Sequence, residues 1–337
     1  MKLCPLVILI VCVAMSLPGC VAGGAGERSS GSRPTAAEVK VSAEQRLKAG
    51  QVLRDAGQLD AALREFNRVL EDNPRSVDAV IGVGTVQHKQ EQITQARETF
   101  TRAVTLDGNR YDARYYLGLM QQVLGETGEA IVQYRKALEL NPDDAATHRD
   151  LATAYLQVGR PDLALPHAQA AVRLEPGSQP AWCNLAATLS LLGRYDEALN
   201  SYRTATEIGQ LDAPVLLGLG DTHLKLNNFQ RAVNTLAELV RQYPSAVAHE
   251  RFGYALFRIY QFEQASNHYR TALTFDPNET AALNGLGACL LTDYFQQENL
   301  RQKGKLHEAL AAWRRSLRVN PSQPRIVELL ARYDGVE

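Results

Sequence analysis

Residues 127–160 read TGEAIVQYRKALELNPDDAATHRDLATAYLQVGR, and similar stretches of about the same length recur along most of the chain. The stretch contains two segments of helical length, separated by Pro142 and followed by Gly159. Proline lacks an N–H group and disfavours helix at the residue before it, whereas glycine readily adopts the left-handed conformation that ends a helix. The stretch therefore predicts two helices, with a boundary at the proline and a turn at the glycine.

Four columns of residues keep the repeats in register. The first column is an alanine, spaced by 34 residues at first, then by 33 and finally by 44. It consists of Ala62, Ala96, Ala130, Ala164, Ala198, Ala232, Ala265 and Ala309. Glycine or alanine lies twelve residues before each of the first seven alanines, a mostly large apolar residue lies four residues after each, and usually a proline lies twelve after. Small residues let the two helices of a unit approach closely, and the large residue fills the gap that they leave.

This pattern resembles the tetratricopeptide repeat, a helix-turn-helix unit with a period of about 34 residues. The resemblance covers residues 43–323 and implies an all-α, right-handed superhelical solenoid of about eight repeats. The expected repeats are 43–76, 77–110, 111–144, 145–178, 179–212, 213–245, 246–279 and 280–323. Residues 324–337 are expected to form a C-terminal capping helix and tail. Since a single helix pair cannot bury its apolar face, the stacked pairs should share a continuous core.

The motif HRDL at 148–151 matches the start of the protein-kinase catalytic loop. However, Tyr155 stands where a kinase needs asparagine, and the chain has no DFG and no Gly-rich loop followed by a strand lysine. Because the motif fits the repeat columns, we predict it inside the first helix of the fourth repeat. GLGDTH at 218–223 and GLGACL at 285–290 lack the third glycine of a phosphate-binding loop and are likewise predicted inside helices.

The other chemistry-bearing residues are scattered. Seven histidines show no HExxH spacing, and Cys183 and Cys289 lie three repeats apart, too far for a disulfide. The sequence therefore predicts no catalytic residue, no metal site and no cofactor, and the protein is not expected to be an enzyme. A balance of 36 Lys plus Arg against 37 Asp plus Glu gives a net charge of −1, so nucleic acid is not an expected partner.

The first twenty residues, MKLCPLVILIVCVAMSLPGC, have the layout of a bacterial secretory signal, with Lys2 followed by a short apolar run and small residues. The ending LPGC resembles the lipobox of bacterial lipoproteins, which implies lipidation of Cys20. A cleaved ordinary signal and an uncleaved anchor are the alternatives. Residues 21–42 are rich in Gly, Ser and Ala and predict a flexible tether. The expected location is the bacterial envelope, lipid-anchored on the periplasmic face of the outer membrane.

The family resemblance also implies a binding groove, because in this family the first helix of each repeat lines the concave face. The candidate groove residues are Tyr115, Leu119, Arg149, Thr153, Asn184, Asp221, Tyr254, Phe257, Arg258 and Asn284. We expect a partly apolar trough that suits an extended peptide or a helix of another protein. For any single candidate, ordinary packing between repeats is the alternative. The Lys and Asn set with which some relatives hold a C-terminal carboxylate is not found, so such a clamp is not predicted.

Two features concern the ends of the helices. Glycines are expected in a left-handed turn between the two helices of several repeats. These are Gly57, Gly125, Gly159, Gly193 and Gly304. The eighth repeat carries ten extra residues before Gly304, which would lengthen its first helix by about 15 Å if they were helical. Tyr294 and Phe295 make this insertion a candidate docking element, with a tolerated loop as the alternative.

The combination of lipobox, tether and repeats favours a non-enzymatic adaptor that assembles or recruits envelope machinery, similar to pilotin-type and other tetratricopeptide lipoproteins. Two other functions stay open. The chain could be the recognition arm of a separate enzyme, as tetratricopeptide superhelices precede the catalytic domain in O-GlcNAc transferases. It could also assemble with copies of itself.

Overall fold

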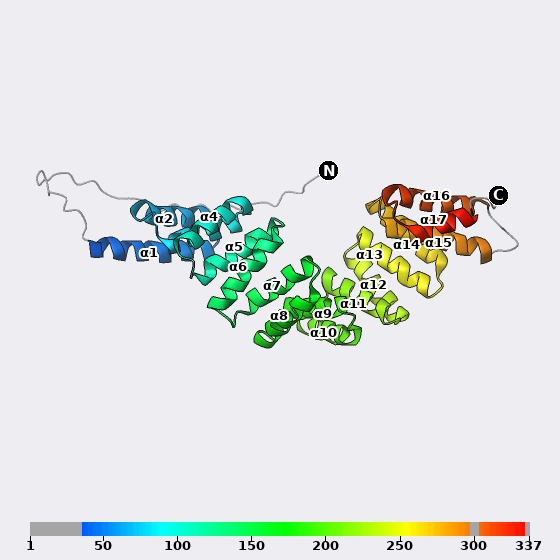
Figure 1. The fold of residues 1–337 in the computed structure, drawn as a ribbon, viewed down its shortest axis with the longest axis horizontal. Coiled ribbons are helices and arrows are strands. Elements are labelled where there is room, and N and C mark those ends of the chain that lie inside the picture. Colours follow the sequence, from blue (N-terminus) through cyan, green and yellow to red (C-terminus); the bar gives the residue numbers. More distant parts are fainter. Residues whose placement is uncertain (1–35, 297–302, 334–337) are drawn as a thin grey trace, which may run out of the picture. The chain divides into compact units, whose positions relative to one another are not determined.

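The computed structural model describes residues 36–296 and 303–333 (Figure 1). The chain divides into two compact units, Met1–Gln45 and Arg46–Glu337. The described part of the first unit is residues 36–45, and they are helical. The predicted signal peptide, Cys20 and the tether up to residue 35 lie outside the described residues, as do residues 334–337 of the predicted tail.

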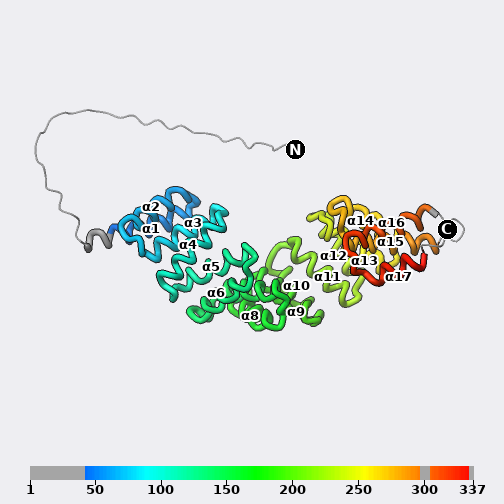
Figure 2. The backbone as a smooth tube through the Cα atoms, turned by 45° about the horizontal axis from the view of Figure 1, so that its top comes forward, coloured from blue at the N-terminus to red at the C-terminus, as the bar shows by residue number. Residues whose placement is uncertain are grey.

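The described residues form seventeen helices and no strand, in an all-α superhelical repeat fold (Figures 1 and 2). The first helices of the successive pairs are α1 (Ala36–Asp55), α3 (Val77–Lys89), α5 (Tyr111–Val123), α7 (Ala145–Gln157), α9 (Gln179–Leu191), α11 (Ala213–Lys225), α13 (Ala246–Arg258) and α15 (Thr280–Gln296). The second helices are α2 (Leu59–Asp72), α4 (Ile93–Leu106), α6 (Thr127–Leu140), α8 (Pro161–Leu174), α10 (Tyr195–Ile208), α12 (Phe229–Gln242), α14 (Phe262–Phe275) and α16 (Lys303–Val319). The last pair is followed by α17 (Pro324–Tyr333).

The helix boundaries follow from residues with simple physical roles. Several first helices begin after a capping side chain: the Asp144 carboxylate accepts from the Thr147 N–H at 2.7 Å, and the Ser245 hydroxyl accepts from the Ala248 N–H at 3.2 Å. Most second helices end two residues before a proline, as α6 ends before Pro142. Both signals can be read from the sequence, and they keep the pairs in register.

The core is built around the alanine column and the large residue that follows it. All eight column alanines are completely buried. The Tyr269 ring lies between Gly253 of its own pair and Gly285 of the next pair, where an added Cβ would come within 3.1 and 2.2 Å of the ring. Phe66 lies in the same way between Gly50 and Gly82, at 2.7 and 2.5 Å. Glycine at these positions therefore lets one buried ring join two consecutive pairs.

The turn between the helices of a pair needs one residue in the left-handed conformation, five positions before the column alanine. Glycine fills this place at Gly57, Gly125, Gly159 and Gly193, with φ between 70° and 80°. Three other pairs use residues that carry a side chain, namely Glu91 (φ 60°), Asn227 (φ 58°) and Tyr260 (φ 65°). A residue with a Cβ is strained there, most of all a bulky one.

Two expectations about helix ends differ from the structure. Helix α1 starts at Ala36, so residues 36–42 of the predicted tether are helical; the segment AAEVKVS contains no Gly or Pro and is rich in helix-forming residues. Gly304 is not a turn residue, because α16 starts at Lys303 and continues through it. Within the described residues, four of the inserted residues lengthen the first helix: α15 has 17 residues against 13 in α13, and α16 has 17 against 14 in α14. The extra residues lengthen both helices, and 297–302 lie outside the described part.

Candidate partner-binding trough

Three cavities follow one another along the first helices from α7 to α15 and reach α17. Their volumes are about 570, 450 and 580 Å³. The first and second share Asp221, and the second and third share Glu250 and Tyr254. The three cavities therefore adjoin one another in a row, and we call them together the trough.

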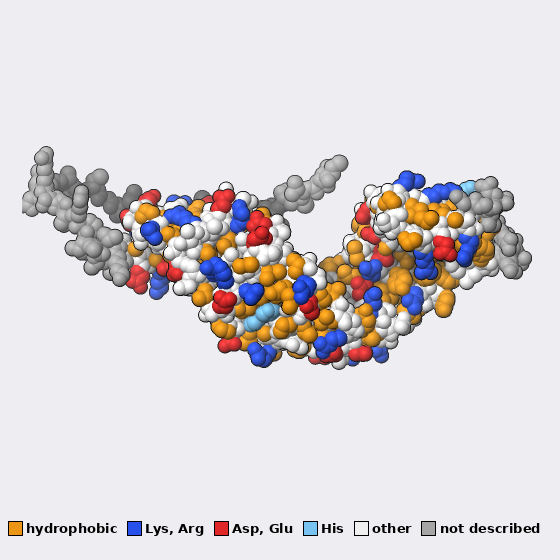
Figure 3. Space-filling view, viewed as in Figure 1, with side chains coloured by type: hydrophobic (Ala, Val, Ile, Leu, Met, Phe, Trp, Pro, Cys, Tyr) orange, Lys and Arg blue, Asp and Glu red, His pale blue; other side chains and the backbone are white. Residues whose placement is uncertain are grey.

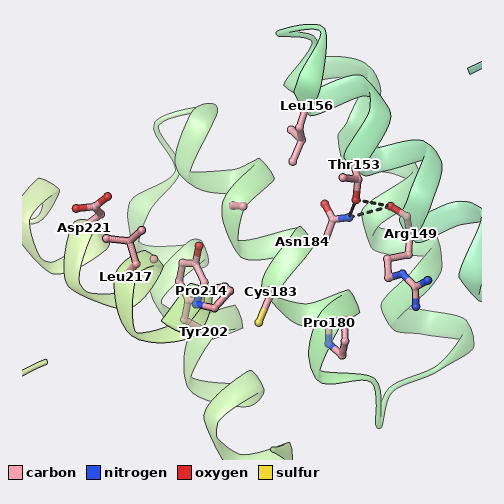
Figure 4. Close-up of a pocket in the computed structure, with 12 residues that line it drawn as sticks. Arg149, Thr153, Leu156, Pro180, Cys183, Asn184, Tyr202, Pro214, Leu217 and Asp221 are labelled. Atoms are coloured by element: carbon pink, nitrogen blue, oxygen red, sulfur yellow. Dashed lines mark hydrogen bonds between the residues drawn. The ribbon is translucent and has the colours of Figure 1, made fainter. Parts of the chain in front are cut away.

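The first cavity lies between α7, α9 and α11 (Figure 4). Its apolar lining comes from Leu156, Pro180, Cys183, Ala187, Tyr202, Pro214 and Leu217. Gly218 makes room for the Tyr202 ring at the wall, because an added Cβ would lie 2.2 Å from the Tyr202 hydroxyl oxygen. This end of the trough is thus shaped to accept an apolar side chain.

One polar wall of the first cavity is tied together by Asn184. Its amide nitrogen donates to the Arg149 carbonyl oxygen at 2.8 Å and to the Thr153 hydroxyl at 2.7 Å, as the dashed lines in Figure 4 show. The Arg149 guanidinium is paired with Asp150, with Nε 2.9 Å from Oδ1. These groups are engaged within the protein and hold α7 and α9 in place beside the cavity.

The second cavity has a charged floor. Arg251 bonds to the Asp221 carboxylate at 3.1 Å and to the Glu250 carboxylate at 2.5 Å. Burial raises the pKa of both carboxyl groups, and the Arg251 charge opposes this shift. Glu279 adds a further negative charge near Glu250 and raises its pKa as well. The Arg251 guanidinium thus offsets part of the desolvation of both carboxylates, and the Lys225 charge also favours ionised Asp221.

The edge of the second cavity is formed by Lys225, Tyr254 and Arg258. The Arg258 guanidinium lies 4.0 Å from the centre of the Phe229 ring and donates to the Tyr254 hydroxyl at 2.9 Å. A cation over an aromatic face is stabilised by the ring electrons. Arg258 is therefore held in a fixed position at the edge of the trough.

The third cavity is lined by the first helices of the last two pairs, by α16 and by α17. Tyr254, Phe257, Ala288 and Trp313 contribute to its apolar lining, and α17 adds Ile326 and Leu329. The expected C-terminal cap thus forms part of a wall of the trough. The contact is fixed through Gln323, whose side-chain oxygen accepts from the Asn284 amide at 2.7 Å.

Eight of the ten predicted groove residues line the trough. The first cavity is lined by Arg149, Thr153, Asn184 and Asp221. The second is lined by Asp221, Tyr254 and Arg258. The third is lined by Tyr254, Phe257 and Asn284. Tyr115 and Leu119 lie outside it: the Tyr115 hydroxyl donates to the Asp150 carboxylate at 2.9 Å, and Leu119 packs against a core cluster between α3, α4 and α5. Both act in packing between repeats.

The predicted docking residues of the insertion lie in different environments. Tyr294 is only 7% exposed and packs with Leu306, Trp313 and Leu330, so it is a core residue and is not available for docking. The added turn of α15 places this side chain on the inward face of the helix. Phe295 is 44% exposed.

The motif HRDL lies in α7, where its residues have structural roles. Asp150 accepts from Tyr115 and pairs with Arg149. His148 Nε2 lies 3.0 Å from the Pro142 carbonyl oxygen, which can only accept, so Nε2 carries the proton and Nδ1 accepts from His167 Nδ1 at 3.0 Å. His249 and His268 repeat this contact at 2.9 Å.

Further observations concern ions and membranes. Within residues 36–296 and 303–333, no group of three or more His, Cys, Asp or Glu side chains could hold a metal ion. No helix in the same ranges has the length and hydrophobicity that crossing a membrane requires. On the face drawn in Figure 3, acidic and basic side chains are interspersed with hydrophobic ones.

Comparison with known families agrees with this architecture. A model of the tetratricopeptide repeat matches residues 47–110 and 149–213, a second matches 191–250, and a model described as TPR repeat matches 123–159. The chain is a tetratricopeptide repeat protein. Repeats of this family support a role as a protein–protein interaction scaffold, and members are typically non-catalytic.

Several solved structures share the fold. A tetratricopeptide repeat protein from Parabacteroides merdae has a TM-score of 0.54 and 18% identity, covering 74% of this chain and 99% of that one. PilF of Pseudomonas aeruginosa has a TM-score of 0.55 and 20% identity, covering 61% and 94%. The APC/C hetero-tetramer Cut9–Hcn1 has a TM-score of 0.60 and 17% identity, covering 86% and 55%. At these identities the similarity shows the fold alone. No curated protein matches the chain in sequence.

Proposed function

We propose that this tetratricopeptide repeat protein is a scaffold that binds a peptide or helical segment of another protein in the trough. The observation that carries the proposal is the row of three adjoining cavities, in which neighbours share Asp221 or share Glu250 and Tyr254. An apolar cavity at each end and a charged one between them provide anchoring pockets and polar orientation for one bound segment.

Blocking the trough without unfolding the chain tests this proposal. Ala288 lines the third cavity, so Ala288→Arg places a long charged side chain in the path of a ligand. Val132 is 47% exposed on helix α6, and Val132→Arg is the matched control. Proteins retained from a membrane extract by the immobilised chain and by Val132→Arg, but lost with Ala288→Arg, would support the proposal. Equal retention by all three would contradict it.

We further propose that the scaffold is lipid-anchored through Cys20 in the bacterial envelope. The support is the sequence LPGC at 17–20 after a short apolar run. Two or more acyl chains on one cysteine give stable membrane binding, whereas a single chain is marginal. Replacing Cys20 with alanine should abolish metabolic labelling by a radioactive fatty acid and move the processed chain out of the membrane fraction. Unchanged labelling would refute lipidation at this residue.

A further inference from the structure

The turn between α13 and α14 carries an unusual residue. Tyr260 has a φ of 65° at the position where four other pairs have glycine. Its side chain is 80% exposed, the most exposed among the large hydrophobic side chains described. A bulky residue in the left-handed region is strained, and such strain concentrates at binding and switch sites. Core packing therefore does not explain why a tyrosine stands here.

The neighbouring Arg258 has a charge without a counterion. Its guanidinium stacks on Phe229 and donates to Tyr254, but the structure gives it no carboxylate partner among the described residues. Lys225, on the same edge of the second cavity, likewise forms no ion pair within the described part of the chain. The carboxylates of the floor, Asp221 and Glu250, are both bonded to Arg251. The Lys225 charge still acts on Asp221, so among the described residues it is Arg258 that is left without a carboxylate partner.

The immobilised guanidinium suits a carboxylate ligand. Arginine binds carboxylates through parallel N–H groups of its planar fork, and a side chain that is already ordered loses little entropy on binding. The guanidinium lies 4.0 Å from the centre of the Phe229 ring, and its Nη1 donates to the Tyr254 hydroxyl. Tyr254 contacts Arg258, and Tyr260 follows Arg258 by two residues in the turn. Tyr and Arg are residue types enriched at interface hot spots.

From this arrangement we infer that Tyr254, Arg258 and Tyr260, here called the acidic-ligand lip, bind an aspartate or glutamate side chain of the partner segment. Apolar residues beside that carboxylate then enter the third cavity at Phe257 and Ala288. The inference rests on the proposed function, since it specifies the chemistry of the segment that the trough takes. It differs from a C-terminal carboxylate clamp because the bound carboxylate belongs to an Asp or Glu side chain of the ligand. The arginine that binds it lies at the turn between two helices.

Peptide selection on the full-length protein tests the inference. Random twelve-residue peptides displayed without a free C-terminus are selected against the chain in detergent and then synthesised as amides. We expect enrichment of Asp or Glu next to apolar residues. Arg258→Gln should weaken the binding of a selected acidic peptide about tenfold to a hundredfold, since hydrogen bonds to charged groups contribute about 1.5–3 kcal/mol. The same peptide with Gln in place of its acid should bind both proteins equally.

Two control variants separate binding from folding. Arg160 follows the turn between α7 and α8 and is paired with Asp162, so Arg160→Gln should leave peptide affinity unchanged. Tyr260→Gly and Glu91→Gly both relieve backbone strain at a residue with a left-handed φ. Only Tyr260→Gly should weaken peptide binding. If the selected peptides lose binding to Ala288→Arg but show no preference for acidic residues, the inference is overturned and the proposed function stands. If the selected peptides bind Ala288→Arg as well as they bind the parent protein, both the inference and the proposed function are overturned.

Discussion

The packing of Tyr269 between two glycines leads to a quantitative prediction for Gly285→Ala. Its added methyl group would lie 2.2 Å from the ring carbon that bears the hydroxyl group. The ring cannot move aside easily, because Tyr269 is 2% exposed and an added Cβ at Gly253 would also lie only 3.1 Å from the ring. Overpacking of a core costs about 1–3 kcal/mol, whereas replacing glycine by alanine within a helix gains up to about 1 kcal/mol. We expect a net loss of about 1–2 kcal/mol in unfolding free energy.

The matched control is Gly128→Ala, because an added Cβ at Gly128 in α6 meets no atom within 4 Å. Urea unfolding followed by circular dichroism should show Gly285→Ala less stable than the parent and Gly128→Ala equally or more stable. A double variant with Tyr269→Leu tests the cause, since removing the ring should abolish most of the cost of the methyl group. Gly285→Ala as stable as the parent would refute the account of the core.

Three further outcomes follow from the structure. Burial and the neighbouring His148 and Arg135 lower the pKa of His167 to about 4, so the unfolded chain gains a proton below about pH 6.5 before the folded chain does. The stability that the neutral His167 provides is complete above about pH 6.5 and is lost as the pH falls to about 4. The unfolding free energy should therefore drop by about 1–2 kcal/mol after solvent screening between pH 7.5 and 4.5 in urea unfolding. The drop should be absent in His167→Gln. Glu91→Gly should raise the unfolding free energy by about 1 kcal/mol, because glycine relieves a left-handed φ of 60°; an unchanged urea midpoint would argue against strain there. Burial raises the pKa of Cys289 to about 12, so iodoacetamide should leave this thiol unmodified until urea unfolds the chain, and rapid native alkylation would disprove its burial.

Much of the fold could be predicted because the residues that pack the helices together recur at regular positions in each repeat. The alanine column, the prolines and most turn glycines act locally, and each marks one helix contact or one helix end. The start of α1 and the helical state of Gly304 could not be read in this way, because both depend on how far a neighbouring helix continues.

The candidate site could be predicted only in part. Position within a repeat identifies which residues of the first helices face the trough, and it placed Asp221 and Tyr254 among them. Position within a repeat does not distinguish these residues from Tyr115, which instead packs against the next repeat through Asp150. The contribution of α17 depends on where the last helix packs, and the apolar face of its sequence alone does not give that position.

The most direct test of the central claim is site-specific photo-cross-linking in the cells that express the protein. A benzophenone amino acid at Ala288 lies in the trough, whereas one at Val132 lies on the exposed side of α6. The account predicts a discrete cross-linked product with another protein from position 288, competed by a trough-binding peptide, and none from position 132. A product from position 132 alone would show that partners bind on the second helices and that the trough is not the binding site.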